Sequence, residues 1–179
     1  KIIIAAYKNN NNLLKRLGIK VEQKFRYELV EKIAILLPKK YKDKSFVVMD
    51  GEFVCLDPYL GTPYHLLSHV KYSKLKIIKK KFSKFPKKYD RALINTKSSN
   101  KKLSNFSKFI EDGVKYLPFL KKAKYIFSYY VVRTLRPNVE STAERTNLTQ
   151  HINNKVLTVL AGKWNTCVYE AKKIEKLLK

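Results

Sequence analysis

The chain has 179 residues, of which 45% are hydrophobic and 12% aromatic. This composition excludes a disordered polyelectrolyte, and the length suits one domain or slightly more. The two cysteines, Cys55 and Cys167, exclude a disulfide framework and fit a reducing compartment. No segment reaches the roughly 20 apolar residues of a membrane span or the apolar run of a signal peptide, so we expect a cytoplasmic protein.

The net charge of +25 arises from 39 basic and 14 acidic residues. Such a balance is typical of proteins that bind nucleic acid or anionic membranes. However, 33 of the basic residues are lysines and only six are arginines, and the chain is also rich in Asn, Ile and Tyr, as in products of AT-rich genomes. Proteins that read bases favour arginine for bidentate contacts. We therefore attribute the charge to genome composition and do not expect a nucleic-acid partner.

The first elements are predicted from an apolar, β-branched run and the asparagines that follow it. Residues 2–6 are typical of a buried parallel strand. Residues 9–17 then predict a helix that an asparagine caps and that Gly18 ends.

The middle of the chain predicts an antiparallel sheet of three or four strands. Apolar residues alternate in places over residues 21–37, which predicts a strand, and residues 45–49, 53–56 and 64–72 are predicted as further strands. The dipeptide Asp50-Gly51 is a strong hairpin signal, and residues 58–63 predict a second turn. His65 and His69 lie in the last of these strands without a third metal ligand at a suitable spacing, so no metal site is expected.

A basic stretch follows the sheet. Residues 71–108 hold fourteen lysines or arginines and one acidic residue, Asp90. We interpret this basic stretch as a solvated face, and residues 95–100 within it as a loop. Beyond it, Ser104 predicts the cap of a helix that runs to about residue 116 and then, past Pro118, to residue 122.

The C-terminal part predicts three strands and a helix. Residues 123–135 and 146–152 are β-prone, and we interpret the face of Tyr125, Phe127, Tyr129 and Val131 as core. Residues 156–160 predict a buried strand. Residues 164–178 predict an amphipathic helix whose residues Tyr169, Ile174, Leu177 and Leu178 are available for packing.

The junction between the last strand and helix has the features of an anion site. The strand runs directly into Ala161-Gly162-Lys163, where small residues allow a ligand to approach the backbone. The helix start contributes free amides and the positive end of its dipole, and Lys163 adds a full charge. Such a place suits an anion or a ring that becomes anionic on reduction.

The sequence from Leu157 to Ala171 closely resembles the flavin-contacting segment of glycerol-3-phosphate dehydrogenases and their relatives in the D-amino-acid-oxidase-like superfamily. Those proteins carry a Gly-Gly-Lys-Trp-Thr-Thr type of loop, in which Ala161 here replaces the first Gly and Asn165 the first Thr. Val132-Arg133-Thr134 and the later Arg145 resemble the arginines of the same family. The start of the chain resembles the last strand of the family's FAD domain, with Tyr7 where many relatives have Gly.

The resemblance implies an α+β fold. Residues 1–18 would be the last strand and helix of the FAD-binding domain, and residues 19–135 an antiparallel substrate-domain sheet with helices. The resemblance is weak over residues 76–105, which we interpret as a variable basic insertion in this domain. Residues 136–179 would return to the FAD-binding α/β domain as a strand, loop and helix. The implied cofactor is FAD, bound by the residues Ala5, Ala6, Ala161, Gly162, Lys163, Trp164, Asn165 and Thr166.

The implied reaction is hydride transfer from an amine or alcohol C–H of a small anionic substrate to flavin. Arg133 would bind the substrate anion, because a guanidinium meets two oxygens at once, and His65 is a further candidate for substrate contact. The sequence singles out no catalytic base.

No Gly-x-Gly-x-x-Gly motif occurs in the sequence, although relatives use that motif to bind the ADP half of FAD. We therefore expect a dinucleotide-binding segment upstream of Lys1, in the same gene or as a split half. Two alternatives stay open. One is a basic module that binds nucleic acid or anionic lipid, and the other is a non-functional fragment.

Overall fold

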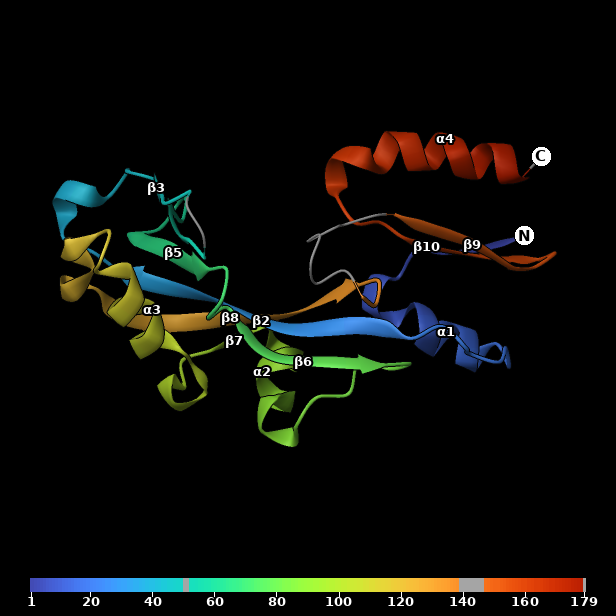
Figure 1. Cartoon of the computed structure of the whole chain (residues 1–179), viewed down its shortest axis with the longest axis horizontal. Helices are drawn as coiled ribbons and strands as arrows, with labels where there is room; N and C mark the ends of the chain where they lie inside the picture. The colour runs from blue at the N-terminus through green and yellow to red at the C-terminus, as the bar shows by residue number, and fades with distance from the viewer. Residues whose placement is uncertain (50–51, 139–146, 179) are drawn as a thin grey trace. The chain divides into compact units, whose positions relative to one another are not determined.

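A computed structural model describes residues 1–49, 52–138 and 147–178, and it shows an α+β fold (Figure 1). The predicted turn at Asp50-Gly51 and the predicted Arg145 lie outside the described residues. The strands are β1 (Ile2–Ile4), β2 (Phe25–Leu36), β3 (Phe46–Val47), β4 (Val54–Pro58), β5 (Tyr64–His69), β6 (Lys74–Lys80), β7 (Lys97–Ser98), β8 (Lys124–Leu135), β9 (Leu148–Asn153) and β10 (Val156–Leu160). The α-helices are α1 (Asn10–Arg16), α2 (Asp90–Asn95), α3 (Phe106–Gly113) and α4 (Cys167–Leu178).

The chain divides into two compact units. Unit 1 comprises Lys1–Tyr27, Ile77–Lys84 and Val132–Lys179, and unit 2 comprises Glu28–Lys76 and Phe85–Val131. The predicted assignment of residues 1–18, 19–135 and 136–179 to two functional domains stays a prediction.

Unit 1 contains a three-stranded sheet in the order β1-β10-β9. The two strands β1 and β10 are parallel, whereas β9 and β10 form an antiparallel pair. The Asn153 side chain closes the turn between β9 and β10 by accepting hydrogen bonds from the backbone amides of Lys155 and Val156. All of β10 is buried, which confirms the strand predicted from its continuous apolar run.

The helix α1 of unit 1 ends as predicted but does not begin as predicted. Gly18 follows it with a φ of 72°, the left-handed conformation that glycine adopts without strain. The predicted asparagine cap is wrong: Asn9 precedes α1, but its side chain makes no capping hydrogen bond. Its Oδ1 instead accepts a hydrogen bond from the Asn12 side chain.

Unit 2 is built on a mainly antiparallel sheet. Its strand order is β3-β4-β5-β2-β8-β7, and β6 pairs with β2. The apolar side chains of one sheet face pack against α3, which contributes Phe106 and Phe109 to the core. The sequence-predicted strands therefore pair as an antiparallel sheet, because their alternating side chains bury one face under a helix.

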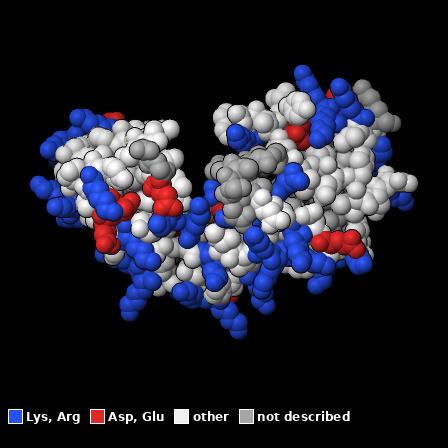
Figure 2. Space-filling view, in the orientation of Figure 1, with Lys and Arg blue, Asp and Glu red and all other residues white. Residues whose placement is uncertain are grey.

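The basic stretch contains more regular structure than the sequence predicted. Most of β6 and all of α2 lie within the residues interpreted as an insertion, and β7 lies within the predicted loop. In β6 the residues Leu75, Ile77 and Ile78 alternate with or adjoin lysines, and pairing with β2 outweighs the low strand propensity of lysine. Figure 2 shows lysine and arginine side chains spread widely over the face in view, with few acidic side chains between them.

The buried carboxylate of Glu31 anchors the start of α3 in unit 2. Its Oε2 accepts a hydrogen bond of 2.9 Å from the backbone amide of Asn105, and its Oε1 accepts one from the hydroxyl of Ser128. Burial raises the pKa of Glu31, although these hydrogen bonds act in the opposite direction. No helix in the described part of the chain is long and apolar enough to cross a membrane.

Candidate functional site

Two of the predicted cofactor-binding segments meet at one edge of the sheet in unit 1. The parallel register pairs Ile4 with Thr158. The residues that follow, Ala5 and Ala6, therefore lie at the same end of the sheet as the loop that begins at Ala161. In open α/β sheets, ligands bind outside the carboxyl ends of the strands. The fold thus brings together residues that are 155 positions apart, at a place where such folds bind ligands.

A buried asparagine joins the ends of these two strands. The Asn10 side chain is 2% exposed. Its Oδ1 accepts a hydrogen bond of 2.7 Å from the Ala6 amide, and its Nδ2 donates one of 2.8 Å to the Val159 carbonyl. Asn10 therefore fixes the turn after β1 against the end of β10. From the sequence, Asn10 was predicted only as part of a helix, because the distant carbonyl it binds is visible only in the fold.

A second asparagine clamps the loop after β10. The Gly162 amide donates a hydrogen bond of 2.6 Å to Asn147 Oδ1, and Asn147 Nδ2 donates one of 2.8 Å to Thr166 Oγ1. The Thr166 hydroxyl in turn donates to the Lys163 carbonyl at 2.8 Å. These three bonds hold both ends of the loop and fix its shape before any ligand binds.

The clamped loop presents its side chains to solvent. Ala161, Lys163, Trp164 and Asn165 are exposed, and the Trp164 side chain is 88% exposed. A large aromatic residue with so little cover is unusual in a folded protein, although single cases occur without a function. The exposed loop can meet a ligand without any rearrangement of the protein around it.

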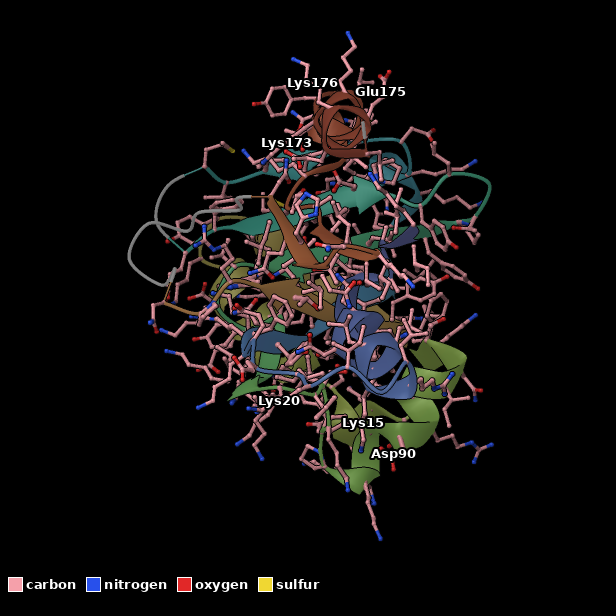
Figure 3. All side chains as sticks on the ribbon, turned by 90° about the vertical axis from the view of Figure 1, so that its right-hand side faces the viewer. Lys15, Lys20, Asp90, Lys173, Glu175 and Lys176 are labelled. Carbon is pink, nitrogen blue, oxygen red and sulfur yellow. The ribbon has the colours of Figure 1, made fainter. Side chains whose placement is uncertain are left out.

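The helix α4 that follows packs on the sheet through a polar residue. Glu170 is buried and its Oε2 accepts a hydrogen bond of 2.9 Å from the Thr149 hydroxyl. The prediction that Tyr169 belongs to the packing face of this helix is wrong, because this side chain is 70% exposed. Lys173, Glu175 and Lys176 project from the same helix (Figure 3). Much of the α4 surface is therefore accessible.

The turn after β1 contains an unusual backbone conformation. Tyr7 has a φ of 53°, in the left-handed region that favours glycine. This is the position at which many relatives were expected to carry glycine. The Tyr7 hydroxyl accepts a hydrogen bond of 3.0 Å from the backbone amide of Thr134, near the end of β8.

The predicted substrate residue Arg133 is half-buried on β8, between the buried side chains of Val132 and Thr134. Strand alternation places its side chain on the sheet face opposite to those of its two neighbours. Val132, Arg133 and Thr134 all belong to unit 1, as do the cofactor-binding candidates.

A groove in unit 1 lies next to the turn after β1 and has a cavity volume of about 590 Å³. Its lining includes two basic side chains and no acidic ones. The lining residues are Ala6, Asn9, Asn12, Leu13, Lys15 and Arg16. A volume of this size falls within the range of small-molecule and cofactor sites.

The predicted substrate residue His65 lies in unit 2 and is 1% exposed. Its Nε2 is 3.0 Å from the Tyr41 carbonyl, so this nitrogen carries the proton and donates. Its Nδ1 has no partner among the described residues. Because the ring is covered, a ligand could reach it only if the residues that cover it moved.

The neighbouring His69 is also a buried, structural residue. Its Nδ1 accepts a hydrogen bond of 3.1 Å from the Lys71 amide, and its Nε2 donates one of 2.8 Å to Asp112. Lys115 and His69 both lower the pKa of Asp112 through their hydrogen bonds. No cluster of three or more potential metal ligands occurs among residues 1–49, 52–138 and 147–178.

A tyrosine pair lies in unit 2, and one of its members, Tyr129 of β8, belongs to the strand face interpreted from the sequence as core. The hydroxyls of Tyr59 and Tyr129 are 2.8 Å apart, and this bond raises the pKa of Tyr59. The ammonium of Lys97 lies 3.8 Å from the ring centroid of Phe127. Phe127 is buried as predicted, whereas Tyr129 is only half-buried. The pairing partner Tyr59 comes from a turn far away in sequence, so alternation along one strand could not reveal the cluster.

No protein-family model matches the chain, and no curated protein matches it. Among solved structures, a glycine oxidase from Geobacillus kaustophilus is similar, with 10% identity and a TM-score of 0.54 over 92% of this chain and 36% of that chain. An L-amino acid deaminase from Proteus vulgaris, with its specific insertion sequence deleted, has 11% identity and a TM-score of 0.49 over 92% of this chain and 34% of that chain. The chain thus spans about a third of the length of each solved structure, and the glycine oxidase shares its fold.

Proposed function

We propose that the chain is the part of an FAD-dependent oxidoreductase that holds the flavin ring and a small anionic substrate. The reaction is hydride transfer from an amine or alcohol C–H of that substrate. One observation carries the proposal: the parallel pairing of β1 with β10 brings Ala5–Ala6 and the loop from Ala161 to one edge of the sheet. This is the edge at which related α/β folds bind their ligands.

The residues at this edge fit the flavin ring by size, exposure and charge. Ala6, Ala161 and Gly162 let a flat ring approach the backbone, and the loop is exposed and fixed by Asn147. Lys163 supplies a positive charge where a reduced ring carries a negative one. When bound, FAD supplies the hydride acceptor for the oxidation.

The remaining residues of the site bind and orient the substrate. In the proposed arrangement Arg133 holds the substrate anion by two parallel hydrogen bonds and so fixes the C–H to be oxidised. His65 is a weaker candidate for substrate contact, because its ring is covered. No described side chain is assigned the role of a base.

The fold shared with a glycine oxidase supports an enzyme of the expected superfamily, and the length of the match supports a second segment. The chain covers 36% of that enzyme and contains no Gly-x-Gly-x-x-Gly. We propose that an upstream segment with this motif, from the same gene or a split half, binds the ADP part of FAD.

The first test measures contact between the flavin ring and the chain itself. Riboflavin, which carries the ring without the ADP half, is titrated into the isotopically labelled 179-residue chain and followed by NMR. We expect amide shifts at Ala6 and over residues 161–166, and none at His65. Shifts that are absent at these loops, or spread evenly over the chain, would contradict the proposal.

The second test uses the protein together with its upstream segment. We expect a yellow protein whose flavin reduction potential falls when Lys163 is replaced by Met, because a cation stabilises the anionic reduced ring. Lys173→Met, on the exposed surface of α4, is the matched control and should leave the potential unchanged (Figure 3). A colourless protein that binds DNA in a salt-sensitive way would instead favour the basic binding module.

A further inference from the structure

We propose that Tyr7 is a positioning residue that ties the turn after β1 to the end of β8 and thereby sets the direction of Arg133. The inference deepens the proposed function, since it rests on Arg133 as the substrate-binding residue. It joins the cofactor side of the site to the substrate side through one side chain.

The backbone conformation of Tyr7 indicates that its side chain makes a stabilising interaction. A φ of 53° in a bulky residue that is not glycine is strained relative to an ordinary conformation. Glycine would adopt this conformation without strain. Since tyrosine stands here, an interaction of its side chain offsets the strain.

That interaction is the hydrogen bond of 3.0 Å from the Thr134 amide to the Tyr7 hydroxyl. The two residues are 127 positions apart in the chain. Thr134 directly follows Arg133 in β8, so the bond fixes the peptide plane on the carboxyl side of Arg133. This plane determines the direction in which the Arg133 side chain leaves the strand.

Both ends of the connection are fixed. On the side of β1, the Ala6 amide is bonded to the buried Asn10 side chain, so the residue before Tyr7 cannot shift freely. On the side of β8, the Thr134 side chain is 2% exposed and its Oγ1 has no partner among the described residues. The Tyr7 hydroxyl therefore holds the Thr134 amide by a polar contact, while the Thr134 side chain contributes none among the described residues.

The test compares Tyr7→Phe and Tyr7→Gly with wild type in the full 179-residue chain. Phenylalanine keeps the ring and removes only the hydroxyl, whereas glycine also removes the backbone strain. The matched control is Tyr169→Phe, which deletes a hydroxyl from an exposed tyrosine. Amide hydrogen exchange reports on Thr134, and the Nε–Hε resonance of Arg133 reports on the guanidinium.

We expect Thr134 exchange to become about threefold to tenfold faster in both Tyr7 variants, as for the loss of one hydrogen bond. The Arg133 resonance should shift in both variants, and the affinity of Arg133 for acetate, a carboxylate probe, should fall by a similar factor. Tyr7→Gly distinguishes a change in the direction of Arg133 from a loss of stability. In this variant the relief of backbone strain offsets the stability lost with the hydrogen bond. The Arg133 resonance and the affinity for acetate should nevertheless change as in Tyr7→Phe.

Unchanged Thr134 exchange and an unchanged Arg133 resonance in both Tyr7 variants would overturn the inference. A wild-type Arg133 that does not respond to acetate would instead refute its proposed substrate role. In that case the Thr134 exchange and the Arg133 resonance alone decide whether Tyr7 positions this residue, and the riboflavin titration tests the cofactor loop separately.

Discussion

In unit 1, Asn10 and Asn147 use their side chains to hold backbone at the edge of a sheet, next to an exposed loop. In unit 2, Glu31 and His69 are buried and use their hydrogen bonds to hold elements of the core. The same kind of interaction therefore has two outcomes. Polar groups in unit 1 shape an accessible surface, whereas those in unit 2 stabilise a closed interior.

This contrast between the two units indicates which polar residues are candidates for ligand binding. His65 and His69 attract attention in a sequence, yet their rings are covered and bonded to the protein. The loop from Ala161 contains fewer residues with obvious chemistry, but it is accessible and its shape is fixed. Accessibility and a fixed shape together are therefore a better criterion for a binding site than the type of residue alone.

Replacing one aromatic residue in each unit should give the largest difference in the free energy of unfolding. Phe109→Ala in unit 2 should lower the free energy of unfolding by about 3 to 5 kcal/mol, because it leaves a cavity in the core. Trp164→Ala in unit 1 should change it by about 0.5 kcal/mol or less, since the side chain is 88% exposed. Chemical denaturation measures both values.

Trp164→Ala should nevertheless reduce the riboflavin-induced shifts of the loop. A large loss of stability in this variant would show that the tryptophan is covered in solution, and the contrast between an accessible and a closed region would fail.

A smaller effect is expected for the asparagine that joins β1 and β10. Asn10→Ala should cost about 2 to 3 kcal/mol, because it leaves the Ala6 amide and the Val159 carbonyl without their partner. The matched control is Asn12→Ala, which removes an exposed bond to Asn9 and should change stability by about 0.5 kcal/mol or less. Equal effects of the two substitutions would mean that Asn10 does not hold the strand ends together.

The smallest expected effect is a change in pH dependence through Glu31. Burial raises the pKa of this carboxyl in the folded state, so its stabilising contribution is complete below the ordinary glutamate pKa of about 4.3 and is lost as pH rises through the folded-state pKa. In Glu31→Gln this contribution is absent. The stability difference between wild type and variant should therefore grow as the pH is lowered from neutral towards 5.

Thermal unfolding at several pH values measures this difference. Glu111→Gln, in the same part of the chain, serves as a control for the removal of one carboxylate. A difference that shrinks as the pH falls would mean that the hydrogen bonds from Asn105 and Ser128 outweigh the effect of burial.

The sequence predicted those elements whose signals are local. The continuous apolar run of β10 and the glycine after α1 each act within a few residues, and both predictions were confirmed. The resemblance around Ala161-Gly162-Lys163 also marked a loop that is exposed at a strand end. These features depend on residues that are neighbours in the chain, so a pattern along the sequence is enough to predict them.

Features that depend on distant partners were missed. The strand β6 forms in a lysine-rich stretch because β2 supplies its pairing partner. Asn10, Asn147 and Tyr7 act through residues 149, 15 and 127 positions away in the chain. No spacing rule connects such pairs, so only the folded chain reveals them.

The position of β1 at the edge of its sheet has a practical consequence for expression of the protein. Among the described strands β1 pairs only with β10, and Ile2 and Ile3 are 47% and 45% exposed. A tag or linker fused ahead of Lys1 would lie directly next to the first residue of this strand. An extended apolar linker would lengthen an unprotected edge and promote aggregation, whereas a linker with proline and acidic residues would interrupt strand addition. The residues chosen for a purification tag thus help to determine whether the chain stays in solution.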